Sequence, residues 1–221
     1  MGKSRTGLAA TVLALTGGFF ILLAFVTPNW LVSDGKLEKP KFTNMGLWMI
    51  CMSGYEDPRH FHDVKFYGCW FLFEEEYYII DEFLFPSFFI ATEFFFMVCF
   101  VLAFIANLLV TTYMCCSRHH DKYIFLLRIC GGNLLASAFA GTIALILFGL
   151  YGDGRDWMPN WEHNNIGWSY AVAVIGIIET YLAGFLFTIE SRVHSIKRRK
   201  RQQAHSDYDL QMQKPSEHSD V

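Results

Sequence analysis

The segment ICGGNLLASAFAGTIALILFGLY, residues 129–151, contains no charged side chain. A helix rises about 1.5 Å per residue and the hydrocarbon core of a bilayer is about 30 Å thick, so about 20 apolar residues cross it once. Three more stretches meet this requirement. We therefore predict a protein with four membrane-spanning helices, over residues 7–27, 88–112, 129–151 and 167–189.

The composition also favours a lipid environment. Of the 221 residues, 53% are hydrophobic and 18% are charged, whereas about 25% are charged in an average soluble domain. The net charge of -3 excludes a generally basic nucleic-acid-binding protein. The first apolar stretch exceeds the core of a secretory signal peptide, and Phe25-Val26-Thr27-Pro28 lacks the small residues of a cleavage site, so we interpret it as a retained helix.

Lysine and arginine are divided unequally between the two sides of the predicted membrane. The two terminal segments and the middle loop carry 12 of them, and the other two loops carry 6. Because positively charged segments stay on the cytosolic side, we predict that both termini are cytosolic. The predicted order is a cytosolic N-terminus, a large extracellular loop, a cytosolic loop, a short extracellular loop and a cytosolic tail, over residues 1–6, 28–87, 113–128, 152–166 and 190–221.

The polar tail, residues 190–221, is predicted to be disordered. We interpret its basic run, Lys197 to Arg201, as a flank that stops translocation rather than as a dedicated inositol-lipid site. The chain ends in Ser219-Asp220-Val221. A carboxylate on an aliphatic residue, with a hydroxyl two residues earlier, suits strand addition to a PDZ groove, so a cytosolic PDZ scaffold is an expected partner.

The large extracellular loop is long enough to fold. Alternating apolar and polar residues around Lys41-Phe42-Thr43 and Val64-Lys65-Phe66-Tyr67 predict short strands. Cys51 and Cys69 are the only cysteines in either extracellular loop, and we expect them to form a disulfide in an oxidising compartment. The predicted fold class is an all-α membrane four-helix bundle with a small extracellular antiparallel β-sheet.

One ordered set of residues points to a family. Trp30 lies just beyond the first span and is followed by Gly46-Leu47-Trp48, Cys51 and Cys69. This order resembles the W-GLW-C-C pattern of the claudin superfamily, which includes claudins, peripheral myelin and epithelial membrane proteins, and calcium-channel gamma subunits. The resemblance implies that Trp30, Gly46, Leu47 and Trp48 clasp the sheet onto the bundle. Independently, Trp30 and Trp48 are expected in the headgroup layer and Gly46 at a close approach.

The resemblance also implies what the protein does. It implies a structural protein of septate-type or tight-junction-type contacts in the plasma membrane, whose extracellular loops associate with copies or relatives, laterally and between cells, to form a paracellular barrier. The alternative is an auxiliary or trafficking subunit of a membrane channel or receptor. The spacing between Cys51 and Cys69 is longer than claudins usually show, which favours a divergent invertebrate claudin-like protein.

Charged residues suggest further roles. The large extracellular loop carries 10 acidic and 5 basic residues, and its acidic run Glu74-Glu75-Glu76 is predicted either to raise the local cation concentration or to be a solvated or partner-docking face. Glu93 and Glu179 are the charges within the predicted spans. We expect Glu93 to reach the interface and Glu179 to hold helices together, protonated or hydrogen-bonded, rather than to transport ions.

The remaining motifs are weak. Cys115 and Cys116, at the cytosolic end of the second span, are candidates for palmitoylation. The histidines lack further ligands at metal-binding spacing, and the chain contains no nucleophile elbow, HExxH motif or phosphate-binding glycine loop. We therefore predict no catalytic, cofactor or metal site, and membrane lipid but not nucleic acid as a partner.

Overall fold

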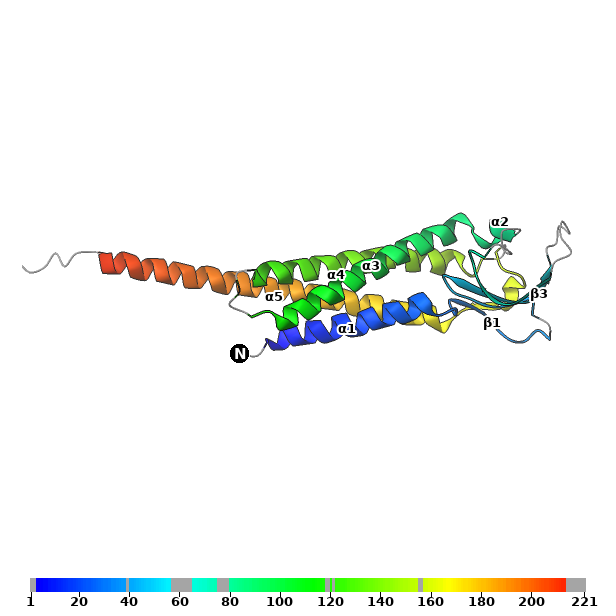
Figure 1. The fold of residues 1–221 in the computed structure, drawn as a ribbon, viewed down its shortest axis with the longest axis horizontal. Coiled ribbons are helices and arrows are strands. Elements are labelled where there is room, and N and C mark those ends of the chain that lie inside the picture. Colours follow the sequence, from blue (N-terminus) through cyan, green and yellow to red (C-terminus); the bar gives the residue numbers. More distant parts are fainter. Residues whose placement is uncertain are drawn as a thin grey trace, which may run out of the picture.

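Four long helices form an elongated bundle (Figure 1). The computed structural model describes residues 3–38, 40–56, 65–74, 80–117, 120, 122–154 and 157–213. The long helices are α1 (Arg5–Val26), α3 (Ser87–Cys115), α4 (Tyr123–Tyr151) and α5 (Trp168–Gln213). Each is long and apolar enough to cross a membrane, and α5 packs against both α1 and α4, while α3 packs chiefly against α4.

Each long helix extends beyond its predicted span at one end or at both. Among the helix starts, that of α4 differs most from the prediction, because the helix begins at Tyr123 rather than at residue 129. The intervening residues include Arg128, whose charge ends the hydropathy signal. A helix satisfies its own backbone hydrogen bonds, so it continues past the edge of the lipid without needing an apolar sequence.

The predicted disorder of the tail is wrong for residues 190–213, because α5 continues to Gln213 as one helix that projects from the end of the bundle (Figure 1). This segment contains neither glycine nor proline and is rich in lysine, arginine and glutamine, which favour helices. The spanning part of α5 also supplies the nucleus, the costly step in forming an isolated helix. A low content of apolar residues therefore excludes a packed core here but does not exclude a helix.

A five-stranded antiparallel sheet caps the opposite end of the bundle (Figure 1). Its strand order is β4-β3-β2-β1-β5, and the short helix α2 (Asp81–Leu84) precedes α3. The strands are β1 (Leu31–Ser33), β2 (Phe42–Met45), β3 (Met49–Glu56), β4 (Lys65–Phe71) and β5 (Asn164–Ile166). The predicted fold class is confirmed, and we call the two ends of the molecule the sheet end and the tail end.

The sheet joins both loops at this end, which the sequence does not predict. Strand β5 comes from the loop between α4 and α5, beyond a short 3-10 helix (Trp161–His163), and pairs with β1 through Leu31 and Ile166. Three residues are too few to show the alternation that marks a strand. Pairing with a strand far away in the chain is what makes this segment extended.

The predicted disulfide is confirmed. Cys51 of β3 and Cys69 of β4 lie directly opposite each other in the strand register and are bonded. They are 18 residues apart in the chain, and closing a loop of that size stabilises the folded state by about 3 kcal/mol in the chain-entropy description. The bond therefore fixes the register of the outer strand pair.

Helix α1 approaches α5 closely at a pair of glycines. A Cβ atom built at Gly17 would lie 3.0 Å from the carbonyl oxygen of Gly176, and one built at Gly176 would lie 3.0 Å from that of Gly17. Helices in lipid associate through such small-residue contacts because hydrophobic burial gives no advantage there. The two glycines therefore set the distance between the first and last spans.

Candidate functional site

A single buried tryptophan contacts all four long helices at the sheet end. Trp30 has no exposed surface, and its ring meets those of Phe96, Phe148 and Tyr170 edge-on, with centroids 4.9, 5.1 and 5.8 Å away. Its indole nitrogen donates a hydrogen bond of 2.8 Å to the carbonyl of Ala24 in α1. Three helices supply aromatic partners that enclose the ring, and the predicted position of Trp30 in the headgroup layer stays a prediction.

The backbone around Trp30 ties the bundle to the sheet. The Trp30 amide donates to the carbonyl of Met45 in β2, at 2.8 Å. On the other side, the amide of Gly167 donates to the Trp30 carbonyl at 2.8 Å, and that of Ser169 donates to the Asn29 carbonyl at 3.1 Å. The link between α1 and β1 is thus bonded both to the sheet and to the start of α5.

Gly46 lies against the same link. A Cβ atom at this position would be 2.6 Å from the Cα of Pro28 and 2.7 Å from the carbonyl oxygen of Thr27. Both neighbours are backbone atoms, which have little freedom to move aside. Asn44, two residues earlier, donates from its side chain to the Pro28 carbonyl at 2.7 Å. The expected close approach at Gly46 is present, and space rather than backbone angle is its cause.

Leu47 and Trp48 complete this contact. Leu47 has no exposed surface and belongs to the same buried cluster as Trp30. The ring of Trp48 packs edge-on against Phe25 of α1 at 5.1 Å, and its carbonyl accepts a hydrogen bond from the amide of Leu72 at 2.9 Å. We call Trp30, Gly46, Leu47 and Trp48 the clasp, because together they join the sheet to the helices.

An exposed aromatic surface lies on the outermost strand. Among the described residues, β4 pairs with β3 alone, so its other edge carries unpaired backbone groups. Tyr67, Trp70 and Phe71 are 60%, 42% and 58% exposed, and the indole of Trp70 donates to the Tyr67 carbonyl at 2.8 Å. We call these three residues the aromatic edge. The sequence analysis missed them, although three large aromatic residues within five positions of a predicted extracellular loop are an unusual signal.

A hydrogen bond between two side chains joins the two loops at the sheet end. Asp34, just after β1, accepts a hydrogen bond from the imidazole of His163 at 2.9 Å, and its amide donates to the His163 carbonyl at 2.7 Å. The His163 hydrogen bond, helped by the Lys36 amide, lowers the pKa of Asp34 below 3.8. The ionised carboxylate therefore contributes its stability at any pH above this value, and the contribution is lost only as the pH falls through the lowered pKa.

The predicted acidic residues have different environments. Glu74 is exposed just beyond β4, and Glu75 and Glu76 lie outside the described residues. That Glu93 reaches the membrane interface stays a prediction. Its side chain is 8% exposed, because it shares the inward face of α3 with the buried Phe89 and Phe96.

Glu179 lies at the contact between α1 and α5, opposite Gly17. Its Oε2 atom is buried and has no hydrogen-bond partner among the described residues. The expected role of Glu179 in holding helices together therefore stays a prediction. Among the described residues, no group of three or more His, Cys, Asp and Glu side chains is arranged to hold a metal ion.

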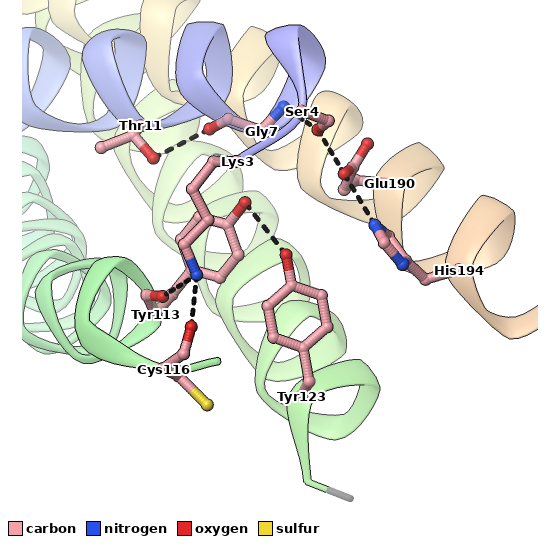
Figure 2. Close-up of polar contacts among 9 residues, drawn as sticks. All are labelled: Lys3, Ser4, Gly7, Thr11, Tyr113, Cys116, Tyr123, Glu190 and His194. Atoms are coloured by element: carbon pink, nitrogen blue, oxygen red, sulfur yellow. Dashed lines mark hydrogen bonds and ion pairs between the residues drawn. The ribbon is translucent and has the colours of Figure 1, made fainter. Parts of the chain in front are cut away.

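At the tail end, the N-terminal segment is fastened to α3 (Figure 2). The Lys3 ammonium donates to the carbonyls of Tyr113 and Cys116 at 2.7 and 2.5 Å, and it lies 4.4 and 5.0 Å from the ring centroids of Tyr113 and Tyr123. A cation at the last carbonyls of a helix is favourable, because these groups lack partners within the helix. Of the predicted palmitoylation sites, Cys115 is exposed and Cys116 is half-buried, and their modification stays a prediction.

A second set of contacts fastens α1 to α5 (Figure 2). Ser4 caps the N-terminus of α1, accepting from the Gly7 amide at 2.9 Å, and its hydroxyl donates to Glu190. The same carboxylate is bonded to the imidazole of His194 at 3.0 Å. Glu190 is 4% exposed, so this acid of α5 is buried within the bundle, where one of its carboxylate oxygens is bonded to both Ser4 and His194.

The family model described as PMP-22/EMP/MP20/Claudin tight junction matches residues 15–189. The matched region starts within α1, ends within α5 and contains the clasp, the disulfide and the aromatic edge. No curated protein matches the chain significantly.

We predict that Gly46→Ala destabilises the folded chain by about 1–3 kcal/mol, because the new methyl group overlaps backbone atoms of the link after α1. Thermal unfolding of the purified protein in detergent measures this change. Gly132→Ala is the matched control, since a Cβ atom there meets no atom within 4 Å. Equal unfolding midpoints for both variants would show that the clasp tolerates a side chain.

Proposed function

Because the chain belongs to the PMP-22/EMP/MP20/Claudin family of non-enzymatic structural membrane proteins, we propose that it is a component of epithelial cell junctions. In this proposal the chain lies in the plasma membrane at lateral cell contacts, with both termini in the cytosol and the sheet end outside. It contributes to the paracellular barrier by association of its extracellular surfaces with copies of itself or with related proteins.

The aromatic edge is the observation that supports this proposal. Large apolar side chains in contact with water are costly, and when they gather at an unpaired strand they favour association with another chain. A second protein that covers Tyr67, Trp70 and Phe71 would bury aromatic rings and pair backbone groups together. Aromatic residues are among those that contribute most to the affinity of protein interfaces.

The clasp and the disulfide prepare this surface for association. Strand β4 is bonded covalently to β3, and the sheet is attached to the helices through Trp30 and its backbone partners. A surface that is already ordered loses less conformational entropy on binding. The rigid attachment also gives the aromatic edge a fixed height above the membrane, which contact between two cells requires.

Charge would add selectivity to the barrier. The large extracellular loop carries a formal charge of -5 from its 10 acidic and 5 basic residues, and Glu74 is exposed beside the aromatic edge. Fixed negative charge attracts cations and repels anions within about 8 Å at physiological salt. In the cytosol, Ser219-Asp220-Val221, which lie outside the described residues, would attach the chain to a PDZ scaffold.

Replacing the aromatic edge by threonine, in the variant Tyr67→Thr/Trp70→Thr/Phe71→Thr, should abolish barrier function while preserving strand propensity. The test is rescue of an epithelium depleted of the chain, measured as transepithelial resistance and as enrichment at lateral contacts. We expect cells that carry the variant to have the same transepithelial resistance as depleted cells. The variant should still be present at the cell surface, which shows that the loss is one of association and not of delivery.

The control for this experiment is Ile166→Thr on β5, the opposite edge of the sheet, which should rescue fully. Full rescue by the aromatic-edge variant would refute association through β4. Uniform surface staining of the unaltered chain, together with co-purification of a channel, would instead support the auxiliary-subunit alternative.

The variant Glu74→Gln/Glu75→Gln/Glu76→Gln should reduce the preference of the barrier for cations, because it removes three fixed negative charges. Dilution potentials across the same epithelium measure the ratio of sodium to chloride permeability. Glu162→Gln, in the other loop of the sheet end, is the control. An unchanged permeability ratio would leave the acidic run as a solvated or partner-docking surface.

Deletion of Val221 should abolish capture of the chain by PDZ domains, because the terminal aliphatic side chain and its carboxylate occupy the groove. A pull-down from epithelial lysate, compared with the full chain, measures the loss. Retention of every PDZ partner after the deletion would rule out this attachment.

A further inference from the structure

A cavity with three arginines opens between α4 and α5 at the tail end. Its volume is about 440 Å³, within the range of small-molecule sites. Arg128 comes from α4, and Arg192 and Arg199 lie two turns apart on one face of α5. The wall also carries three hydroxyl groups, those of Thr188, Ser191 and Ser195.

The positive charge of this cavity is uncompensated within the part of the chain that the structure describes. No ion pair there joins Arg128, Arg192 or Arg199 to an acid. Glu190, the nearest acid along α5, is instead bonded to Ser4 and His194 (Figure 2). Three guanidinium groups around one cavity therefore create a positive potential that favours an anionic ligand.

The walls of the cavity are held in place by the bundle. Ser191 is 3% exposed, and its hydroxyl donates to the carbonyl of Ile124 in α4 at 3.4 Å. Thr188 donates to the Gly184 carbonyl at 2.8 Å. The first bond links α5 to α4 and the second lies within α5, and together they order the side chains between the arginines, so the cavity exists before a ligand enters it.

The positions of the arginines along α5 indicate the kind of anion. The predicted span ends at residue 189, so Arg192 lies about 4–5 Å beyond the hydrocarbon edge, within a headgroup layer about 5–7 Å thick. Arg199 lies about 10 Å farther along the helix, so it is farther from the hydrocarbon than the phosphodiester of an ordinary phospholipid. A lipid that contacts both arginines must therefore carry a second phosphate group, farther from the membrane than its phosphodiester.

We propose that this cavity binds the headgroup of a phosphorylated inositol lipid in the cytosolic leaflet. Arg128 and Arg192 hold the phosphodiester, and Arg199 holds a phosphate on the inositol ring. Guanidinium groups suit this task, because they form paired hydrogen bonds to phosphate oxygens. Basic cavities between spanning helices on the cytosolic side are suited to such headgroups.

Exposed apolar side chains lie at the depth where acyl chains would be. Ile129 of α4 and Ile189 of α5 are 38% and 52% exposed, and they are the first and last residues of the predicted third and fourth spans. Only Arg199 of the basic run Lys197–Arg201 lines the cavity. A general role of that run in stopping translocation does not account for Arg128 and Arg192, which lie outside it.

The test measures lipid affinity of the full chain, purified in detergent, with and without the three charges. The variant Arg128→Gln/Arg192→Gln/Arg199→Gln should bind a short-chain phosphatidylinositol bisphosphate at least about tenfold more weakly than the unaltered protein. The matched control, Lys197→Gln/Lys200→Gln/Arg201→Gln, removes the same charge from residues that do not line the cavity, and its affinity should change less than about threefold.

Two further ligands identify the source of the phosphates. Short-chain phosphatidylserine and soluble inositol trisphosphate should each bind at least about tenfold more weakly than the bisphosphate lipid, because one lacks the outer phosphates and the other lacks the acyl chains. Equal binding of phosphatidylserine would overturn the assignment to inositol lipids. Equal binding of inositol trisphosphate would overturn the lipid and indicate a soluble ligand.

Equal losses in the cavity variant and the control would show that the tail attracts anions without a site. Thermal unfolding without lipid checks that each variant is folded. If the triple variant does not fold, Arg192→Gln alone should still weaken binding about threefold or more, and unchanged affinity in that variant would refute the cavity. None of these measurements depends on junction formation, so they remain informative if the proposed barrier function fails.

Discussion

The enclosure of Trp30 is the constraint on which the rest of the structure depends. One side chain packs against aromatic rings of α3, α4 and α5 and is bonded to the end of α1, so the four helices share a contact at the sheet end. Lipid gives no hydrophobic driving force between helices, and packing and hydrogen bonds must supply it. A large ring with a single donor provides both, where the chain leaves the first helix.

The same point determines how the sheet is attached. The residues beside Trp30 bond to β2 and to the start of α5, and Gly46 leaves room for this link to pass. The disulfide then holds β4, the strand farthest from the link, to β3. The sheet is small and has little core of its own. It is attached to the helices on one side and held by the disulfide on the other, so the aromatic edge has a defined position.

The opposite end of the bundle is organised by polar contacts. Lys3 caps α3, and Glu190 is satisfied by Ser4 and His194. Because Glu190 is bonded to these two residues, the arginines between α4 and α5 have no acidic partner among the residues that the structure describes. The two ends thus differ in the contacts described for them: aromatic packing around Trp30 at the sheet end, and polar side-chain bonds and arginines at the tail end.

The sequence by itself determined the four spans, the disulfide pair and the order of the clasp residues, because apolar length and cysteine position are local properties. Tertiary structure decided the features that depend on contacts between distant segments. These are the burial of Trp30 and Glu93, the pairing of β5 with β1, and the cavity that both Arg128 and Arg192 line. The helical tail was misjudged for a related reason. Its composition excludes a core, but its attachment to a spanning helix provides the nucleus that an isolated segment lacks.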